Sequence, residues 1–232
     1  MVTEQQVIAI VPARAGSKGI PHKNLQPLAG RTLLQWTVDL AMSMPEFDRC
    51  IVSTDGAAIA REARRLGATV HDRPLRLATD TALVIDTVRD VLATDLALHA
   101  TVVVLLQPTS PLRSIDDVRG CLRGLADGAD SAATVTHASS HPDLAIRLED
   151  GVVRPYHGDA LPWAPRQRLP DAFQLTGSVY AARAAKMPAA TRSMLFGRVH
   201  PVIVPRERSI DIDEPCELMM AAALLRQGID AS

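Results

Sequence analysis

The chain has 232 residues, with 25 Lys and Arg against 26 Asp and Glu, which gives a formal net charge of −1. That balance argues against a nucleic-acid-coating protein and against a polybasic membrane surface, because both need a large positive excess. Hydrophobic residues make up 47% and charged residues 22%, which is typical of a folded protein with a substantial core. Aromatic residues are only 3%, so a base-stacking platform is not expected.

Three cysteines, Cys50, Cys121 and Cys216, lie far apart and form no pair at metal-ligand or redox spacing. We interpret them as small buried hydrophobic residues in a reducing compartment. The first residues lack a basic segment, and no apolar run is long enough to span a bilayer. We therefore expect a cytoplasmic protein with neither a membrane nor a nucleic-acid polymer as partner.

The hydrophobic pattern predicts alternating strands and helices. In chain order these are a strand at Val7–Val11, a helix at Arg31–Met44, strands at Cys50–Ser53 and Ala68–His71 separated by a helix at Ala57–Leu66, a helix at Leu83–Leu92, a central strand at Thr101–Leu106, a helix at Ile115–Ala126 and a strand at Ser131–Thr136. This alternation predicts an α/β fold, a doubly wound and mostly parallel sheet.

The pattern breaks between residues 139 and 171, a stretch rich in Pro, Arg and His. We interpret this stretch as an insertion in an otherwise single domain over residues 1–232. The α/β pattern then resumes with strands at Gly177–Ala181 and Val202–Val204 and a final helix at Pro215–Leu225.

The segment that follows the first strand, Pro12–Asn24, has the composition of a phosphate-binding loop. It combines two glycines, a hydroxyl and three cations, which are Gly16, Gly19, Ser17, Arg14, Lys18 and Lys23. The spacing matches neither the Walker A loop nor Gly-x-Gly-x-x-Gly. The alternative is a solvated basic loop after an edge strand.

Two acidic residues near the end of the chain, Asp211 and Asp213, alternate with Ile210 and Ile212. On an extended backbone both carboxylates then share one face while both isoleucines point inward. Two hard oxygen ligands on one face suit Mg²⁺. The alternative for Asp213 is a cap on the helix that begins near Pro215.

Two other groups of polar residues are interpreted as structural. Asp55, in the sequence Ser53-Thr-Asp-Gly56, is expected to form a turn and is left out of the metal site. His137 and His141 are four residues apart, but Pro142 argues against a helix, so we interpret them as loop residues rather than as a zinc site.

Five segments in order resemble motifs of the acylneuraminate cytidylyltransferases, the CMP-sialic acid synthetases. They are Ile10–Asn24, Ile51–Gly56, Arg73-Pro74 with Ala78–Thr81, Leu105–Arg113 and Ser209–Asp213. The resemblance implies a Rossmann-like nucleotidyltransferase fold with a small dimerisation subdomain at approximately 139–171, and a homodimer. It also implies transfer of CMP from MgCTP to the anomeric hydroxyl of a nonulosonic, sialic-type acid, with release of pyrophosphate.

The same resemblance implies roles for individual residues. Arg14, Lys23 and Asp211 are expected to be catalytic, and Asp211 and Asp213 to bind Mg²⁺. The nucleotide-binding residues are expected to be Arg14, Ser17, Lys18, Lys23, Asn24, Arg73 and Ala82. For Arg73 the alternative is a loop residue before Pro74. Arg113 is a secondary candidate, with a surface cation beside a helix as its alternative.

The acceptor-binding residues implied by the resemblance are Gln107, Arg166, Gln174 and Tyr180, with Arg166 reaching the site from the partner subunit. This sequence departs from the sialic-acid pattern at Gln174-Leu-Thr176, where Arg-Pro-Asn is usual, and after His141-Pro142, where a lysine is usual. Another 3-deoxy-ulosonic acid, a phosphonate, or a non-catalytic nucleotide-binding relative are therefore the alternatives.

Overall fold

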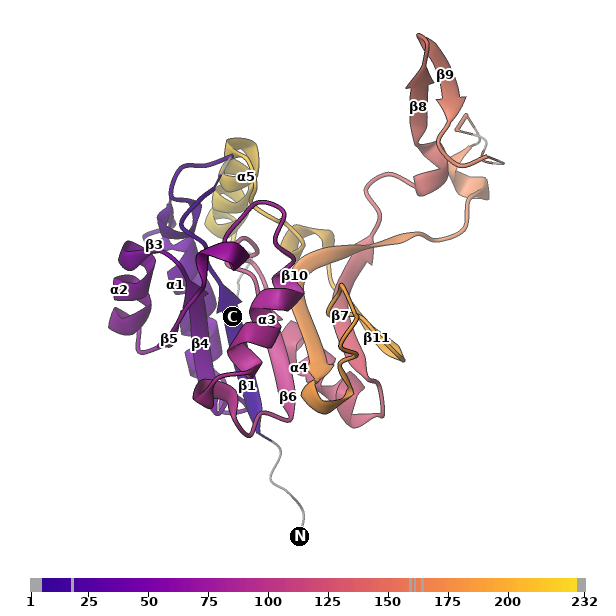
Figure 1. Cartoon of the computed structure of the whole chain (residues 1–232). Helices are drawn as coiled ribbons and strands as arrows, with labels where there is room; N and C mark the ends of the chain where they lie inside the picture. Colours follow the sequence, from indigo (N-terminus) through magenta and orange to yellow (C-terminus); the bar gives the residue numbers. More distant parts are fainter. Residues whose placement is uncertain (1–5, 18, 159, 161, 164, 229–232) are drawn as a thin grey trace.

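The computed structural model describes residues 6–17, 19–158, 160, 162–163 and 165–228. Its centre is a seven-stranded sheet with the strand order β11-β7-β10-β6-β1-β4-β5 (Figure 1). The strands are β1 (Val7–Pro12), β4 (Arg49–Thr54), β5 (Thr69–Asp72), β6 (Val102–Leu106), β7 (Ser131–His137), β10 (Phe173–Arg183) and β11 (Val199–Ile203). Every predicted strand is present, and the predicted central strand is the middle one of the sheet.

The sheet is doubly wound and mostly parallel, as the alternation predicts. Strands β6, β1, β4 and β5 run parallel, and β11 runs parallel to β7. Only β10 is antiparallel to its neighbours in this sheet. The chain leaves β1 toward β4 and β5 and then returns to the other side of β1 with β6. The carboxyl ends of β1 and β6 therefore form the point of strand-order reversal where ligands bind in such sheets.

The described residues form five α-helices, four of which pack on the faces of the sheet, while the last packs in a separate apolar cluster. They are α1 (Leu33–Ser43), α2 (Ala57–Arg65), α3 (Val84–Leu92), α4 (Ile115–Ala126) and α5 (Pro215–Arg226). Strand β1 shows how the layers form, because its side chains alternate between the faces. Ala9 and Val11 pack in one cluster with residues of α1, α2 and α4. Ile8 and Ile10 pack in a second cluster with residues of α3.

Local signals explain where the helices begin and end. The helix predicted from Arg31 begins at Leu33, because the Thr32 hydroxyl oxygen accepts a hydrogen bond from Gln35 N at 3.0 Å and caps it. Arg31–Thr32 instead forms the short strand β3, which pairs with β2 (Pro27–Leu28). Helix α2 ends before Gly67, whose φ of +84° is the conformation for which glycine is favoured at this position.

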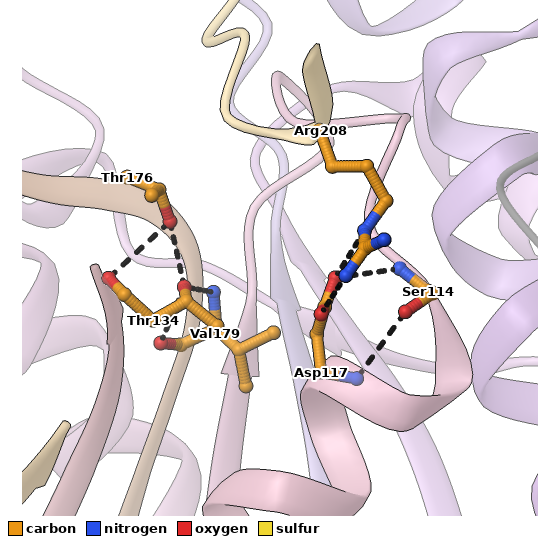
Figure 2. A network of polar contacts seen from close by, with 6 residues as sticks. All are labelled: Ser114, Asp117, Thr134, Thr176, Val179 and Arg208. Atoms are coloured by element: carbon orange, nitrogen blue, oxygen red, sulfur yellow. Dashed lines mark hydrogen bonds and ion pairs between the residues drawn. The ribbon is translucent and has the colours of Figure 1, made fainter. Parts of the chain in front are cut away.

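Strand β10 is longer than the predicted Gly177–Ala181 and contains a bulge. The register with β7 shifts between Leu175 and Tyr180, so four residues of β10 lie opposite Thr134 alone. The Thr134 hydroxyl fills the gap: it lies 2.6 Å from the Thr176 hydroxyl and accepts a hydrogen bond from Val179 N at 3.2 Å (Figure 2). These buried contacts satisfy groups that the bulge removes from the ladder.

A third apolar cluster joins the two ends of the chain. Ile20, which follows the predicted phosphate loop, packs with Leu28, Leu112 and Ile212, and Ala221 contributes from α5. Residues near position 20 and near position 212 are therefore held together by hydrophobic packing.

The segment 139–171, predicted as an insertion, contains a hairpin of β8 (Ile146–Glu149) and β9 (Val152–Pro155). Its turn is Asp150-Gly151, both with positive φ, which is the geometry of a two-residue hairpin turn. Figure 1 shows this hairpin standing apart from the seven-stranded sheet.

The structure bears on two expectations from the composition, which concern the cysteines and membrane-spanning helices. Cys50 and Cys121 are buried as predicted, and burial raises the pKa of each thiol to about 12. The prediction is wrong for Cys216, which is exposed on the first turn of α5 because that side of the helix faces solvent. No helix in the described part of the chain is long and apolar enough to cross a membrane.

Candidate active site

A cavity of about 660 Å³ opens at the carboxyl ends of β1 and β6. It brings together most of the residues predicted to bind nucleotide, namely Arg14, Ser17, Lys23, Asn24, Arg73 and Ala82. Asp211, Asp213 and Gln107 line the same cavity. Lys18 lies outside the described residues. Residues from four separate parts of the sequence therefore meet at the point of strand-order reversal.

The loop after β1 is held in shape by two side-chain hydrogen bonds to its backbone. Ala15 N donates to Asp55 Oδ1 at 2.8 Å, and Asn24 Nδ2 donates to the Arg14 carbonyl oxygen at 2.9 Å. Asp55 is therefore more than the turn residue that its sequence suggests, because it fixes the loop backbone. Strand β1 lies between β6 and β4, so the alternative of a loop after an edge strand is wrong.

Two glycines of the loop were both predicted to allow close approach of a ligand. A Cβ at Gly19 would collide with the carbonyl oxygen of Asp213, whereas a Cβ at Gly16 would meet nothing within 4 Å. Gly19 is thus required for contact between the loop and the acidic segment. Gly16 borders open space, so no neighbouring atom requires a glycine at this position.

The described cations of the loop are paired with acids from distant parts of the chain. Arg14 Nη1 lies 2.7 Å from Asp80 Oδ1, and Lys23 Nζ lies 2.6 Å from Asp213 Oδ1. Asp80 lies within the motif Ala78–Thr81, but its pairing with Arg14 was not predicted, because 66 residues separate the two. Both cations line the cavity, and each has further N–H donors, besides the one used in its ion pair, that can bind a phosphate oxygen.

Arg73 is buried at the back of the cavity rather than in an open loop. Its Nη2 donates to the Ser53 carbonyl oxygen at 2.7 Å and its Nε to Ser53 Oγ at 3.2 Å. Burial lowers the pKa of Arg73 to about 10, which still leaves the guanidinium charged at neutral pH. The cavity therefore contains a fixed positive charge whose side chain is already ordered.

The acidic pair is arranged as the alternation with isoleucine predicts. Ile212 is buried and Ile210 is partly buried in the third cluster, while Asp211 and Asp213 line the cavity. Ile212 N donates to the Thr109 carbonyl oxygen at 2.7 Å, which fixes the segment against the loop after β6. Asp213 does not cap α5, so that alternative is wrong: the cap is Glu214, in a capping box with Glu217.

Asp211 is the better prepared of the two carboxylates to bind a cation. Its Oδ1 is buried without a hydrogen-bond partner among the described residues. Burial raises the pKa of Asp211, while a hydrogen bond from Thr109 acts in the opposite direction. A buried, unpartnered carboxylate oxygen beside a second carboxylate is a donor set that fits Mg²⁺, which takes one or two carboxylates together with phosphate oxygens and waters.

Arg113 is not a surface cation, and that alternative is wrong. Its side chain is only 1% exposed, because it turns inward between β6 and α4. Nε donates to the Ser110 carbonyl oxygen at 3.1 Å, and Nη2 donates to the Gln107 carbonyl oxygen. Burial lowers the pKa of Arg113 to about 9, and the charges of Asp211 and Asp117 oppose this shift. Arg113 thus shapes the loop that carries Gln107 and Thr109.

A second buried acid fixes the chain just before the acidic pair (Figure 2). Asp117, in the first turn of α4, accepts hydrogen bonds from Arg208 Nη2 at 2.7 Å and Arg208 Nε at 3.2 Å. It also accepts from Ser114 N at 2.9 Å in the capping box of α4. Arg208 precedes Asp211 by three positions, so this ion pair anchors the approach to the proposed metal ligands.

The structure places the four predicted acceptor residues in different parts of the molecule. Gln107 lines the cavity at the end of β6. Tyr180 is half-buried on β10, and burial raises the pKa of its hydroxyl. Gln174 lies away from the cavity lining, and its Oε1 accepts hydrogen bonds from Ser139 N and Ser139 Oγ at 3.2 and 3.4 Å. Arg166 begins a 3-10 turn, Arg166–Arg168, between the hairpin and β10.

Gly177 is a site residue that was predicted only as part of a strand. Its φ is +77°, and a Cβ there would lie 3.2 Å from Asp211 Oδ2. The bulge in β10 therefore brings backbone close to Asp211, and a Cβ at position 177 would require Asp211 to shift by a few tenths of an ångström. A glycine inside a strand pattern is a sequence signal for such an approach.

The comparisons with known proteins agree with this geometry. The profile of the cytidylyltransferase family matches residues 8–191. The CMP-N,N'-diacetyllegionaminic acid synthase of Legionella pneumophila is 32% identical over 97% of this chain and 99% of its own length. The N-acylneuraminate cytidylyltransferase of Escherichia coli O18:K1:H7 is 28% identical over 97% of this chain, which spans 54% of that relative.

Among solved structures, CMP:2-keto-3-deoxy-manno-octonic acid synthetase complexed with CTP superposes with a TM-score of 0.69. The superposition covers 97% of this chain and all of the other, at 17% sequence identity, and thus supports the fold. The match over residues 8–191 and the full-length relative show the family. The chain belongs to the cytidylyltransferase family of nucleotidyltransferases.

Proposed function

We propose that the enzyme transfers CMP from CTP to the anomeric hydroxyl of a nonulosonic, sialic-type acid and releases pyrophosphate. The observation that carries the proposal is the cavity at β1 and β6, which has the cationic loop on one side and Asp211 with Asp213 on the other. Such a site holds a triphosphate and a divalent cation together. Relatives named for legionaminic and neuraminic acid support the acceptor class.

The loop after β1 binds the triphosphate in this proposal. Arg14 and Lys23 exchange their carboxylate partners for phosphate oxygens, with Ser17 and Lys18 as further ligands. Cations held on the leaving side stabilise the charge that develops on pyrophosphate as the bond to the α-phosphorus breaks. Arg14 and Lys23 are catalytic in that sense. Asn24, Arg73 and Ala82 hold the nucleoside.

Asp211 and Asp213 would hold Mg²⁺ in this proposal, with the buried, unpartnered Asp211 Oδ1 as one of the ligand oxygens. When bound, the ion neutralises charge on the phosphates and polarises the α-phosphoryl group. Lys23 then releases Asp213 and turns to phosphate. Lys23 thereby changes its ion-pair partner when the metal ion and the nucleotide are bound.

Acceptor binding falls to Gln107 and Tyr180, joined by Arg166 from a partner subunit. Gln174 has a different part in this chain, because its amide already holds Ser139 at the base of the hairpin. The two cations that sialic-acid enzymes carry at position 174 and after Pro142 are missing here. Another 3-deoxy-ulosonic acid or a phosphonate is the alternative acceptor.

The homodimer is supported by the hairpin. A two-stranded hairpin is marginally stable alone in water. Here Ile146, Leu148 and Val153 share one face through the Leu148–Val153 pair, and the face is exposed. A second copy covers this face in the dimer. We expect the dimer to act in the cytoplasm.

The test is pyrophosphate release from CTP and Mg²⁺ with a panel of acids: a legionaminic acid, N-acetylneuraminic acid, 2-keto-3-deoxy-manno-octonic acid and a phosphonate. We expect release with the first two and formation of the CMP conjugate. Release only with the third or fourth acid would establish the alternative acceptor. No release with any acid, with CTP still bound, would establish a binding protein instead.

A further inference from the structure

A line of buried polar side chains extends behind Arg73, away from the cavity. Ser53 Oγ lies 2.9 Å from His71 Nδ1, and His71 Nε2 lies 3.3 Å from Asp90 Oδ2. Ser53 belongs to β4, His71 to β5 and Asp90 to α3, so the line crosses from the sheet to a helix. Ser53 is fully buried and His71 is 5% exposed. The line ends at the surface, where Arg76 Nη2 donates to Asp90 Oδ1 at 2.9 Å.

The Arg73 guanidinium and the Asp90 carboxylate determine which atom donates at the two ends of the line. A guanidinium only donates, so Ser53 Oγ accepts from Arg73 Nε at 3.2 Å. A carboxylate only accepts, so His71 Nε2 carries a proton and donates to Asp90. A neutral ring that carries its proton on Nε2 has an unprotonated Nδ1, which accepts the Ser53 hydroxyl hydrogen. Burial lowers the pKa of His71 and Arg73 adds to that effect, which agrees with a neutral ring.

Serine, histidine and aspartate in a row also occur in hydrolases, but this line is not a nucleophilic triad. Ser53 has no exposed surface, and its Oγ is occupied by Arg73. No substrate can reach it. The line points instead at the one member that lines the cavity, which is Arg73.

We propose that His71, oriented by Asp90, is a positioning residue that fixes the Arg73 guanidinium for the nucleotide through the Ser53 hydroxyl. The inference rests on the proposed function, in which Arg73 binds CTP. Two of the three guanidinium nitrogens are tied to Ser53, and no hydrogen bond joins Nη1 to another described residue. An arginine fixed in advance loses less conformational entropy when its ligand binds, so the line raises affinity without contacting the nucleotide.

The central test is a double-mutant cycle on CTP affinity, measured by calorimetry with CTP and Mg²⁺. We expect His71→Leu and Ser53→Ala each to weaken CTP binding by about tenfold, the effect of losing one buried hydrogen bond. Because His71 acts through Ser53, the double variant should bind no more weakly than Ser53→Ala alone. Effects that multiply, or a His71→Leu protein with unchanged affinity, would overturn the proposal.

Two conservative variants separate the two ring nitrogens. Asparagine places an acceptor near the position of Nδ1, and glutamine places a donor near the position of Nε2. We expect His71→Asn to keep affinity within about threefold of the wild type and His71→Gln to lose about tenfold. The reverse order would show that the contact with Asp90, rather than the contact with Ser53, matters for the nucleotide. Val91→Ala, a core substitution within α3, controls for a general loss of stability.

A second readout does not depend on CTP. In nitrogen-15 NMR of histidine-labelled protein, the signals lost in His71→Asn should show a neutral ring protonated at Nε2 at pH 7. A ring protonated at Nδ1, or a charged ring, would refute the line itself. If the wild type binds no CTP while the ring has the expected tautomer, the proposed function fails and the positioning of Arg73 stands.

Discussion

Asp211 lines the cavity as a candidate metal ligand, but its burial is unfavourable for a charged carboxylate in the free protein. Its carboxylate lines the cavity, yet Oδ1 is buried without a partner, and burial raises the pKa of Asp211. A charged oxygen without a partner destabilises the fold. In the proposed function, a bound Mg²⁺ would supply the missing partner for this oxygen.

We expect Asp211→Asn to separate these effects. Turnover should fall by about 100-fold or more, because a charged ligand at the transferring phosphate is lost. The free energy of unfolding should rise by about 1 kcal/mol, since a buried amide is less costly than a buried carboxylate. Activity assays and thermal unfolding measure the two. Glu207→Gln, on the surface nearby, is the control, and a fall in stability at Asp211 would contradict the expectation.

The burial of His71 makes the free energy of unfolding depend on pH. Because burial lowers its pKa in the folded state, the unfolded chain takes up the proton first as pH falls below about 6.5. Stability therefore decreases with falling pH until the lowered pKa is reached, and the loss then stops. Asp90 and Asp72 limit the shift and Arg73 increases it.

The measurement is urea denaturation between pH 5 and 8 for the wild type and His71→Leu. The wild type should lose more stability on acidification than the variant, in which this group is absent. Equal slopes for the two proteins would show that His71 does not contribute. The comparison with the variant removes the contribution of the other histidines.

Among elements, β10 shows how one strand shapes a catalytic site. Its bulge is stabilised by Thr134 and Thr176 and presents Gly177 to Asp211. The strand thus acts through its backbone, since a side chain at position 177 has neither a favourable φ nor space.

We expect Gly177→Ala to reduce turnover by about tenfold or more, because Asp211 must move away from the new Cβ. Stability should fall by about 1 kcal/mol through backbone strain. Gly67→Ala is the matched control: its φ is +84°, but a Cβ there meets only Met42 at 3.5 Å. It should lose similar stability with unchanged turnover. Equal turnover losses in both variants would contradict a local effect on Asp211.

The sequence predicts helices and strands better than it predicts the contacts between them. The end of α2 was predicted because Gly67 acts locally, whereas α1 begins two residues later than predicted because the Thr32 cap was missed. The alternation of Asp211 with isoleucines was also local, and it placed both carboxylates correctly in the cavity. By contrast, the antiparallel direction of β10 and the pairing of Arg14 with Asp80 depend on distant segments that only the fold brings together.

At the scale of the whole molecule, we expect the hairpin to form the interface of the proposed dimer. Leu148 is 72% exposed, and its neighbours across the hairpin are apolar. Such a face needs a partner to remain dry. If a partner's Arg166 completes the acceptor site, assembly and activity depend on each other.

We therefore expect Leu148→Asp to shift the protein from dimer to monomer and to reduce turnover at a given acceptor concentration, with CTP affinity unchanged. Light scattering after gel filtration and calorimetry measure these effects. Arg154→Asp, on the other face of the hairpin, is the control. A dimer that persists in Leu148→Asp would place the interface elsewhere.

The contact between the two ends of the sequence also has a consequence during synthesis. The loop after β1 is translated early, whereas Asp213, which pairs with Lys23, follows 190 residues later. A nascent chain that has not reached the acidic segment carries the cations without the acids, and the third apolar cluster lacks Ile212. Such a chain has no complete active site. In the proposed function, such a chain lacks both carboxylates of the metal site, so we expect nucleotide turnover only after almost the whole domain has been translated.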